Sequence, residues 1–139
     1  VTWAGQLETL LVDSDIVSIH VVLSDRTRYL IGGGHLALMK PDALLVNTSR
    51  GPILDESAVI PALEAGRPGR IALDVFSTEP LPADHPLRHR RLIDEGRLLL
   101  TPHLGYATRQ TYATMYAEAV ESVSAWLSGA PVRVIAAPG

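Results

Sequence analysis

Four short apolar runs recur along the chain at an even spacing, over residues 16–21, 43–47, 71–75 and 97–101. A polar residue lies at the tail of each run, and these residues are 27 positions apart every time: His20, Asn47, Asp74 and Thr101. A strand, a turn and a crossover helix together occupy about 30 residues, so the spacing predicts four strands joined by crossovers. The runs are continuous rather than alternating, which predicts strands buried on both faces of the sheet.

Helical patterns fill the intervals between the runs. A leucine stripe over residues 7–11 predicts a short amphipathic helix, and a second short helix is predicted over residues 34–39. Asp55 is a suitable N-cap for a helix over residues 56–65. Pro61 should kink or shorten that helix, because proline has no amide hydrogen to donate.

The clearest helix is the last one. Thr108 is placed to cap it, apolar residues then recur at helical spacing, and Gly129 and Pro131 end it. Residues 78–95 contain three prolines and mixed charges, which predicts a long surface loop. The glycine cluster at residues 32–34 does not fit a phosphate-binding turn, and we interpret it as a turn that opens a short helix.

The alternation of strands and helices predicts an α/β fold with a parallel sheet and right-handed crossovers. Ligands of such sheets bind in the crevice outside the carboxyl ends of the strands. Three polar turns should therefore meet at one edge, at residues 47–50, at residues 74–79 and at His103.

Composition narrows the classes of function. The chain has 139 residues, 47% of them apolar and 19% charged, which is typical of one folded domain. Its net charge is −3 and no basic stripe is visible, so nucleic acid is not an expected partner. No apolar run approaches the roughly 18 residues of a membrane span, and the absence of cysteine fits a cytoplasmic protein.

The first chemical motif is Asn47-Thr48-Ser49-Arg50-Gly51. An arginine on a turn beyond a buried strand presents a planar set of donors that suits a carboxylate and a neighbouring carbonyl oxygen. For an isolated arginine, an ordinary surface role would be the more common interpretation.

Two further motifs supply titratable groups, namely Asp74 and Glu79 after the third run and His103 between a proline and a glycine. Histidine can pass a proton near neutral pH, and a nearby carboxylate can orient it and favour its protonated form. The alternatives are a turn-capping Asp74, a solvated Glu79 and a turn histidine with one backbone hydrogen bond. His85 and His89 lie four residues apart in the predicted loop, but no third ligand is evident, so we expect no metal site.

Taken together, these motifs resemble the D-isomer-specific 2-hydroxyacid dehydrogenases in sequence, order and spacing. The resemblance runs from about residue 7 to residue 134 and rests on residues 13–20, 38–41, 46–51, 72–76 with Glu79 and Pro80, and 100–105. It implies half of a Rossmann-like doubly wound sheet, with residues 1–139 forming part of a nucleotide-binding domain. It also implies an enzyme that uses NAD, or NADP, to interconvert small 2-hydroxy and 2-keto acids.

The same resemblance assigns roles to individual residues. Arg50 would bind the substrate carboxylate and carbonyl, His103 would be the general acid and base, and Glu79 would pair with His103. Asp74 would face the nicotinamide. The nicotinamide ribose and carboxamide would be lined by Thr48, Ser49 and the turn from His103 to Gly105.

The resemblance also sets expectations for what lies outside the chain. The glycine-rich phosphate-binding turn and the substrate domain should precede Val1, the complete enzyme should be a homodimer, and the isolated chain should be inactive. A glyoxylate/hydroxypyruvate reductase or a phosphoglycerate dehydrogenase is the expected type. Formate dehydrogenases carry glutamine where Glu79 stands, which disfavours them. An NAD(H)-sensing co-repressor of the same fold is the alternative from another class.

Overall fold

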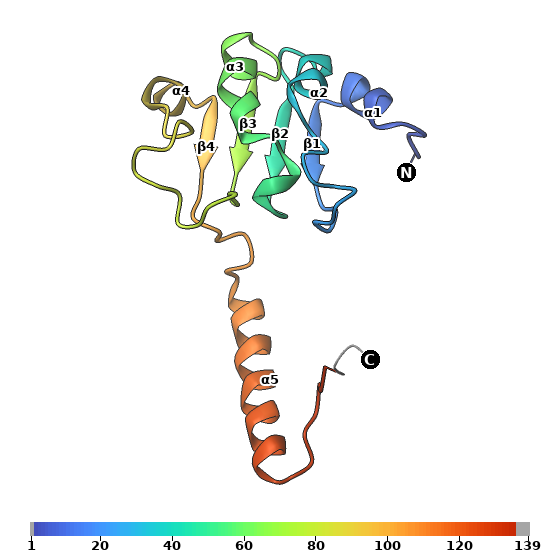
Figure 1. The fold of residues 1–139 in the computed structure, drawn as a ribbon, viewed down its shortest axis with the longest axis vertical. Helices are drawn as coiled ribbons and strands as arrows, with labels where there is room; N and C mark the ends of the chain where they lie inside the picture. Colours follow the sequence, from blue (N-terminus) through green and yellow to red (C-terminus); the bar gives the residue numbers. More distant parts are fainter. Residues whose placement is uncertain (1, 136–139) are drawn as a thin grey trace. The chain divides into compact units, whose positions relative to one another are not determined.

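The computed structural model describes residues 2–135, which divide into one unit that ends at Leu104 and a second that begins at Gly105. The first unit contains a four-stranded parallel sheet in the order β1-β2-β3-β4 (Figure 1). Its strands are β1 (Ile16–Ile19), β2 (Leu44–Asn47), β3 (Arg70–Leu73) and β4 (Leu98–Leu100). The predicted parallel α/β fold is therefore confirmed, and each strand lies within, or one residue outside, its apolar run.

Four α-helices accompany the sheet: α1 (Leu7–Asp13), α2 (Gly33–Leu38), α3 (Val59–Glu64) and α4 (Arg90–Asp94). Two 3₁₀ turns, η1 (Gly51–Ile53) and η2 (Glu56–Ala58), connect β2 to α3. The predicted helices before the first strand and after the glycine cluster are confirmed by α1 and α2.

The helix predicted over residues 56–65 is shortened, as the proline within it suggested. Asp55 accepts a hydrogen bond from the Ser57 amide at 3.1 Å, but the residues that follow form η2 instead of an α-helical turn. The α-helix begins only at Val59, which places Pro61 in its first turn. An amide in that turn has no partner within the helix, so its absence costs little there.

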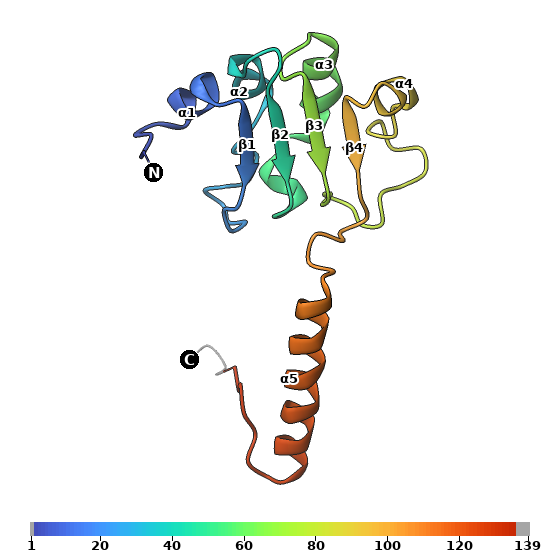
Figure 2. The same ribbon diagram turned by 180° about the vertical axis from the view of Figure 1, so that it is seen from behind.

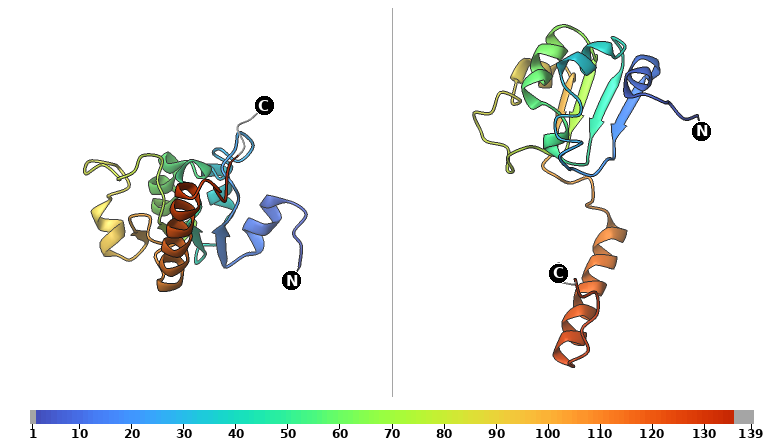
Figure 3. Two further views of the ribbon diagram at one scale, coloured as in Figure 1. Left: turned by 90° about the horizontal axis from the view of Figure 1, so that it is seen from below. Right: turned by 45° about the vertical axis from the view of Figure 1, so that its right-hand side comes forward.

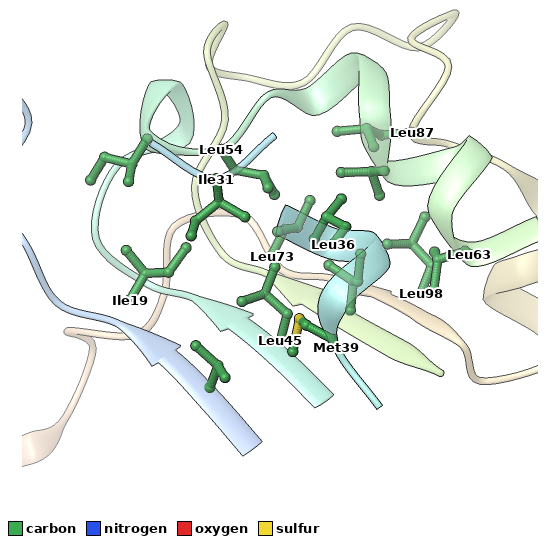
Figure 4. Packing of buried hydrophobic residues seen from close by; sticks show 14 of the residues in the cluster. Ile19, Ile31, Leu36, Met39, Leu45, Leu54, Leu63, Leu73, Leu87 and Leu98 are labelled. Carbon is green, nitrogen blue, oxygen red and sulfur yellow. The ribbon is translucent and has the colours of Figure 1, made fainter. Parts of the chain in front are cut away.

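The hydrophobic core lies on one face of the sheet. Val17, Leu45, Ile71 and Leu98 are in register across the four strands, and all four are buried. Leu36 and Met39 lie over the strands beside Leu45 and Leu73 (Figure 4). Helices α1, α3 and α4 add Leu11, Leu63 and Leu92 to the same cluster.

The other face of the sheet is largely uncovered, so the prediction of burial on both faces is wrong for this unit. Ile16 and Leu99 are 67% and 60% exposed, although each neighbours a buried residue on its strand. Strand order follows chain order, so crossovers of one hand place every connecting helix on the same side. Figures 2 and 3 show α2 and α3 on one face only, with the strands open to view from behind.

The segment over residues 78–95 was predicted to be a long surface loop, and the structure corrects this prediction. It contains helix α4, and its Leu81, Leu87 and Leu92 side chains are buried in the core cluster. These leucines anchor the segment beside β4, which is the strand that α4 precedes.

The second unit consists mainly of α5 (Arg109–Leu127). The Thr108 side chain caps it by accepting a hydrogen bond from the Thr111 amide at 3.0 Å, and Gly129 follows it with a φ of 77°. Both features confirm the predicted helix. None of its residues is buried. In the part of the chain that the structure describes, no helix has the length and apolar character needed to cross a membrane.

Candidate active site

The turn after β2 folds around the side chain of Asn47, which is fully buried. Its Oδ1 accepts a hydrogen bond from the Ser49 amide and its Nδ2 donates one to the Arg50 carbonyl, both at 3.0 Å. The Ser49 hydroxyl donates to the Val21 carbonyl at 2.7 Å, which fixes the turn against the segment that follows β1. The side chains of Thr48 and Arg50 are exposed at this edge of the sheet.

Gly51 brings the Arg50 turn into contact with the turn that follows β3. A Cβ atom on Gly51 would lie 2.1 Å from the carbonyl carbon of Phe76 and 2.4 Å from the Ser77 nitrogen. No larger residue fits without moving one of the two backbones. Arg50 itself donates from Nη1 to the Ser49 carbonyl at 2.6 Å, which holds the guanidinium close to its own turn.

Asp74 joins the ends of β3 and β4. Its side chain is buried, and Oδ1 accepts hydrogen bonds from the Thr101 hydroxyl at 2.5 Å and from the Leu104 amide at 2.8 Å. The Asp74 carbonyl accepts a third from the His103 amide at 2.8 Å. The amides on either side of the His103 Cα atom, those of His103 and Leu104, are thus both bound to Asp74.

His103 and Glu79 form a direct pair. The His103 Nδ1 atom lies 2.7 Å from Oε2 of Glu79, and Oε1 of Glu79 accepts a hydrogen bond from the Phe76 amide at 2.8 Å. His103 adopts a φ of 55°, a left-handed conformation that is uncommon outside glycine. Such conformations persist where surrounding bonds enforce them, as the bonds from the His103 and Leu104 amides to Asp74 do here.

Competing effects act on the Glu79 carboxyl. Burial raises its pKa, whereas the hydrogen bonds from His103 and the Phe76 amide and the positive charges of His103 and Arg50 lower it. The net effect is a pKa below the usual value for glutamic acid, so this carboxyl is ionised at neutral pH. The effect of Arg50 also places its charge within electrostatic reach of the pair.

A cavity of about 500 Å³ adjoins the pair, a volume in the range of small-molecule sites. Glu79 and His103 contribute to its lining, and Arg88 lies at its wall with two of its nitrogens bound to the Leu81 and Pro82 carbonyls. The remaining lining is apolar except for Thr101 and comes from Phe76, Pro80, Leu81, Leu100, Thr101 and Pro102.

The predicted site residues of the first unit therefore meet at the carboxyl edge of the sheet. Gly105 is the first residue of the second unit. Among residues 2–135 there is no cluster of three or more side chains suited to a metal ion. His85 and His89, which the sequence placed four residues apart, face different carboxylates, Glu56 at 3.8 Å and Glu64 at 3.9 Å.

Sequence reasoning assigned no role to Asn47, although its amide shapes the Arg50 turn. The available signal was its position, because a polar side chain that ends a buried apolar run must find partners nearby. The neighbouring turn supplies those partners, and a buried asparagine at such a point predicts a turn folded around its side chain.

Comparison with known proteins identifies the family. Residues 1–105 match the family described as D-isomer specific 2-hydroxyacid dehydrogenase, NAD binding domain. A glyoxylate reductase from Aeropyrum pernix is 46% identical over 88% of this chain, and a glyoxylate/hydroxypyruvate reductase B from Pectobacterium carotovorum is 44% identical over 88%. The chain covers only 35% and 37% of the lengths of these two relatives.

Solved structures agree with this result. The structure of D-lactate dehydrogenase with NAD⁺ from Lactobacillus jensenii matches with a TM-score of 0.79 at 27% identity, over 96% of this chain and 43% of that one. The sheet and the turns at its carboxyl edge lie within residues 1–105, the segment that matches the family. The chain therefore belongs to the D-isomer specific 2-hydroxyacid dehydrogenase family, and residues 1–105 match the NAD-binding domain of that family.

Proposed function

We propose that this chain forms part of the nucleotide-binding domain of a dehydrogenase that transfers hydride between NAD(H) and a small D-2-hydroxy or 2-keto acid. The Glu79–His103 pair, at 2.7 Å beside the Arg50 turn, is the observation that carries the proposal. The reductase names of the two curated relatives favour glyoxylate or hydroxypyruvate as substrate, and a phosphoglycerate dehydrogenase is the related possibility. Because the chain spans about a third of those relatives, the proposal concerns a longer protein.

In the direction of reduction, Arg50 binds the substrate carboxylate with its planar donors and orients the keto oxygen toward His103. His103 Nδ1 is engaged by Glu79, so the ring gives its proton to that oxygen from Nε2. The ionised Glu79 keeps the ring oriented through its contact with Nδ1. Arg50 and the imidazolium together stabilise the negative charge that develops on the oxygen.

The polar groups at the sheet edge fit the nicotinamide end of the cofactor. Thr48 is exposed and Ser49 is half-buried beside Arg50, while Asp74 holds the turn that carries His103. We assign Thr48, Ser49, Arg50, Asp74 and His103 to this end, together with Gly105. When bound, NADH supplies the hydride. The pyrophosphate-binding glycine turn and the substrate domain would come from the rest of the protein, which we propose to be a cytoplasmic homodimer.

The Arg50→Lys substitution tests the proposal in the complete protein. Lysine keeps the charge but not the planar pair of donors, so KM for the keto acid should rise and kcat should fall, and both should change much more than the affinity for NADH. The assay is NADH oxidation with glyoxylate and hydroxypyruvate, with NADPH as the comparison cofactor and the isolated 139-residue chain as the control expected to be inactive. Wild-type kinetics in the lysine variant would refute the role of Arg50. NADH binding without turnover of any keto acid would indicate a sensor instead of an enzyme.

A further inference from the structure

Glu56 is an acidic residue of η2 whose side chain is only 12% exposed. Its Oε1 atom accepts a hydrogen bond from the Ser77 amide at 2.6 Å. Its Oε2 atom faces Nε2 of His85 at 3.8 Å. The carboxylate therefore contacts two points of the segment that joins β3 to α4, and its short bond goes to the turn directly after β3.

Ser77 belongs to the turn that carries Glu79. The preceding amide, that of Phe76, donates to Oε1 of Glu79, and the other oxygen of Glu79 binds His103. The two consecutive amides of this turn thus bind two different glutamates. The hydrogen bond to Glu56 fixes the direction of the Phe76–Ser77 peptide. That peptide directly follows the Val75–Phe76 peptide, whose amide orients Glu79. A bond from a carboxylate to an amide is charge-assisted, so it is about twice as strong as a neutral one.

The same peptide is held from a second direction. The Gly51 backbone packs so closely on Phe76 and Ser77 that no side chain fits between them. Gly51 and Glu56 lie on one short segment that begins directly after Arg50. This segment therefore holds the Glu79 turn at two points and fixes its position relative to Arg50.

We propose that Glu56 is a positioning residue for the Glu79–His103 pair. It acts by holding the Ser77 amide, which keeps the Glu79 carboxylate in line with Nδ1 of His103. Its consequence for catalysis rests on the function proposed above, whereas its effect on the pair is a property of this chain alone. The charged or titratable groups around the pair are Arg50, Arg88 in the wall of the adjoining cavity and Asp74, which accepts from the Leu104 amide. His85 faces Glu56.

The test is an NMR titration of the His103 ring in the 139-residue chain, with its signal assigned by its loss in His103→Ala. Glu79→Gln sets the reference, because loss of the neighbouring charge makes the ring release its proton at lower pH. Glu56→Ala should give a large part of that shift. Glu56→Asp keeps the charge but shortens the reach to Ser77, so it should behave like Glu56→Ala. Glu56→Gln keeps an acceptor at the right distance and should stay close to the wild type.

Asp55→Ala is the matched control, because it removes an adjacent carboxylate that binds Ser57 and not Ser77. It should lower the urea midpoint of the chain without moving the His103 titration. A wild-type titration in both Glu56→Ala and Glu56→Asp would overturn the proposal. An equal shift of the His103 titration in Asp55→Ala would also overturn it, because the shift would then reflect a general loosening of the segment. Equal shifts in Glu56→Ala and Glu56→Gln, with none in Glu56→Asp, would overturn it as well, because they would reflect only the charge of Glu56.

Kinetics of the complete protein separate this inference from the proposed function. With an active wild type, Glu56→Asp should reduce kcat for keto-acid reduction by roughly 10-fold to 10²-fold, the cost of a small misplacement of a reacting group, and Glu56→Gln should restore most of it. Unchanged kcat in Glu56→Asp would overturn the catalytic part of the inference. A wild type that reduces no keto acid would overturn the proposed function, whereas the titration still decides whether Glu56 positions the pair.

Discussion

Replacement of Gly51 by alanine tests whether the contact between the two turns holds the site together. The added Cβ atom would lie 2.1 Å from the Phe76 carbonyl carbon, whereas ordinary contacts begin at 3.4 Å. The difference, 3.4 minus 2.1, requires the two backbones to separate by about 1.3 Å. The nearest atoms all belong to the backbone and cannot rotate away. We therefore expect a cost at the upper end of the overpacking range, about 3 kcal/mol of unfolding free energy.

Urea denaturation of the 139-residue chain, followed by circular dichroism, measures this cost. A loss of about 3 kcal/mol corresponds to a decrease in midpoint of roughly 1–3 M urea for a small domain. Gly34→Ala is the matched control, because Gly34 lies in α2 and a Cβ there meets no atom within 4 Å. That variant should be neutral or more stable by up to about 1 kcal/mol, since alanine favours helix.

The reasoning also predicts a local effect on the site. A displacement near 1 Å between Arg50 and Glu79 should reduce kcat/KM of the complete enzyme by about 10²-fold. If Gly51→Ala unfolds at the same urea concentration as the wild type, the close approach of the two turns is wrong. If the two alanine variants lose equal stability, the loss does not come from this contact.

Three further substitutions test the pair and the core. In the complete enzyme, His103→Ala should reduce kcat by roughly 10²-fold to 10⁴-fold in steady-state assays, the usual contribution of a positioned acid and base. Although burial raises the pKa of Glu79, hydrogen bonds and neighbouring positive charges lower it, so the group that faces Nδ1 of His103 is a negative charge, which glutamine removes. In Glu79→Gln the alkaline limb of kcat/KM for reduction should therefore move to lower pH, and an unchanged or alkaline-shifted limb would show that Glu79 does not tune the ring. Leu45→Ala should cost about 2–5 kcal/mol in urea denaturation, because Leu45 is fully buried at the centre of the sheet.

The main elements of the fold could be predicted because their signals are local. Each apolar run is long enough to specify a strand, and the cap and stop residues of α5 are read directly from the sequence. Helix α4 has only five residues, which is too short for a helical period to be visible among the prolines that precede it. Leu81, Leu87 and Leu92 then looked like scattered loop residues, although they fill the core beside β4.

The apolar runs predict the strands correctly, but they do not predict which faces of the sheet are buried. An apolar side chain shows that a position tolerates or prefers burial, and it does not show which layer covers it. Ile16 and Leu99 are apolar and exposed because all the crossover helices of this unit lie on the opposite face. Coverage of a sheet depends on strand order as well as on composition, and strand order is not a local property of the sequence.

The candidate site likewise contains residues that local sequence signals predict and residues that they do not. The residues to which we assign the chemistry could be found from the rule that ligands bind at the carboxyl edge of a parallel sheet, and they are Arg50, Glu79 and His103. The residues that hold them could not, because Glu56 and Ser77 are 21 positions apart and meet only through the path of two loops. The left-handed backbone of His103 likewise depends on hydrogen bonds that Asp74 accepts from the His103 and Leu104 amides.

Three polar side chains that are largely removed from solvent explain why this edge can be rigid without forming a deep core. The side chains of Asn47, Glu56 and Asp74 each bind at least one amide of a turn that carries a functional group. Within the described residues, no buried side-chain nitrogen or oxygen lacks a hydrogen-bond partner. A fully satisfied polar network holds its members in one geometry, because any other arrangement leaves a group desolvated and unbonded. The carboxylate and imidazole that we propose to be catalytic lie on turns and need such external restraint, since turns contribute few buried contacts of their own. The positions most sensitive to substitution at this edge should therefore include residues that never contact the substrate.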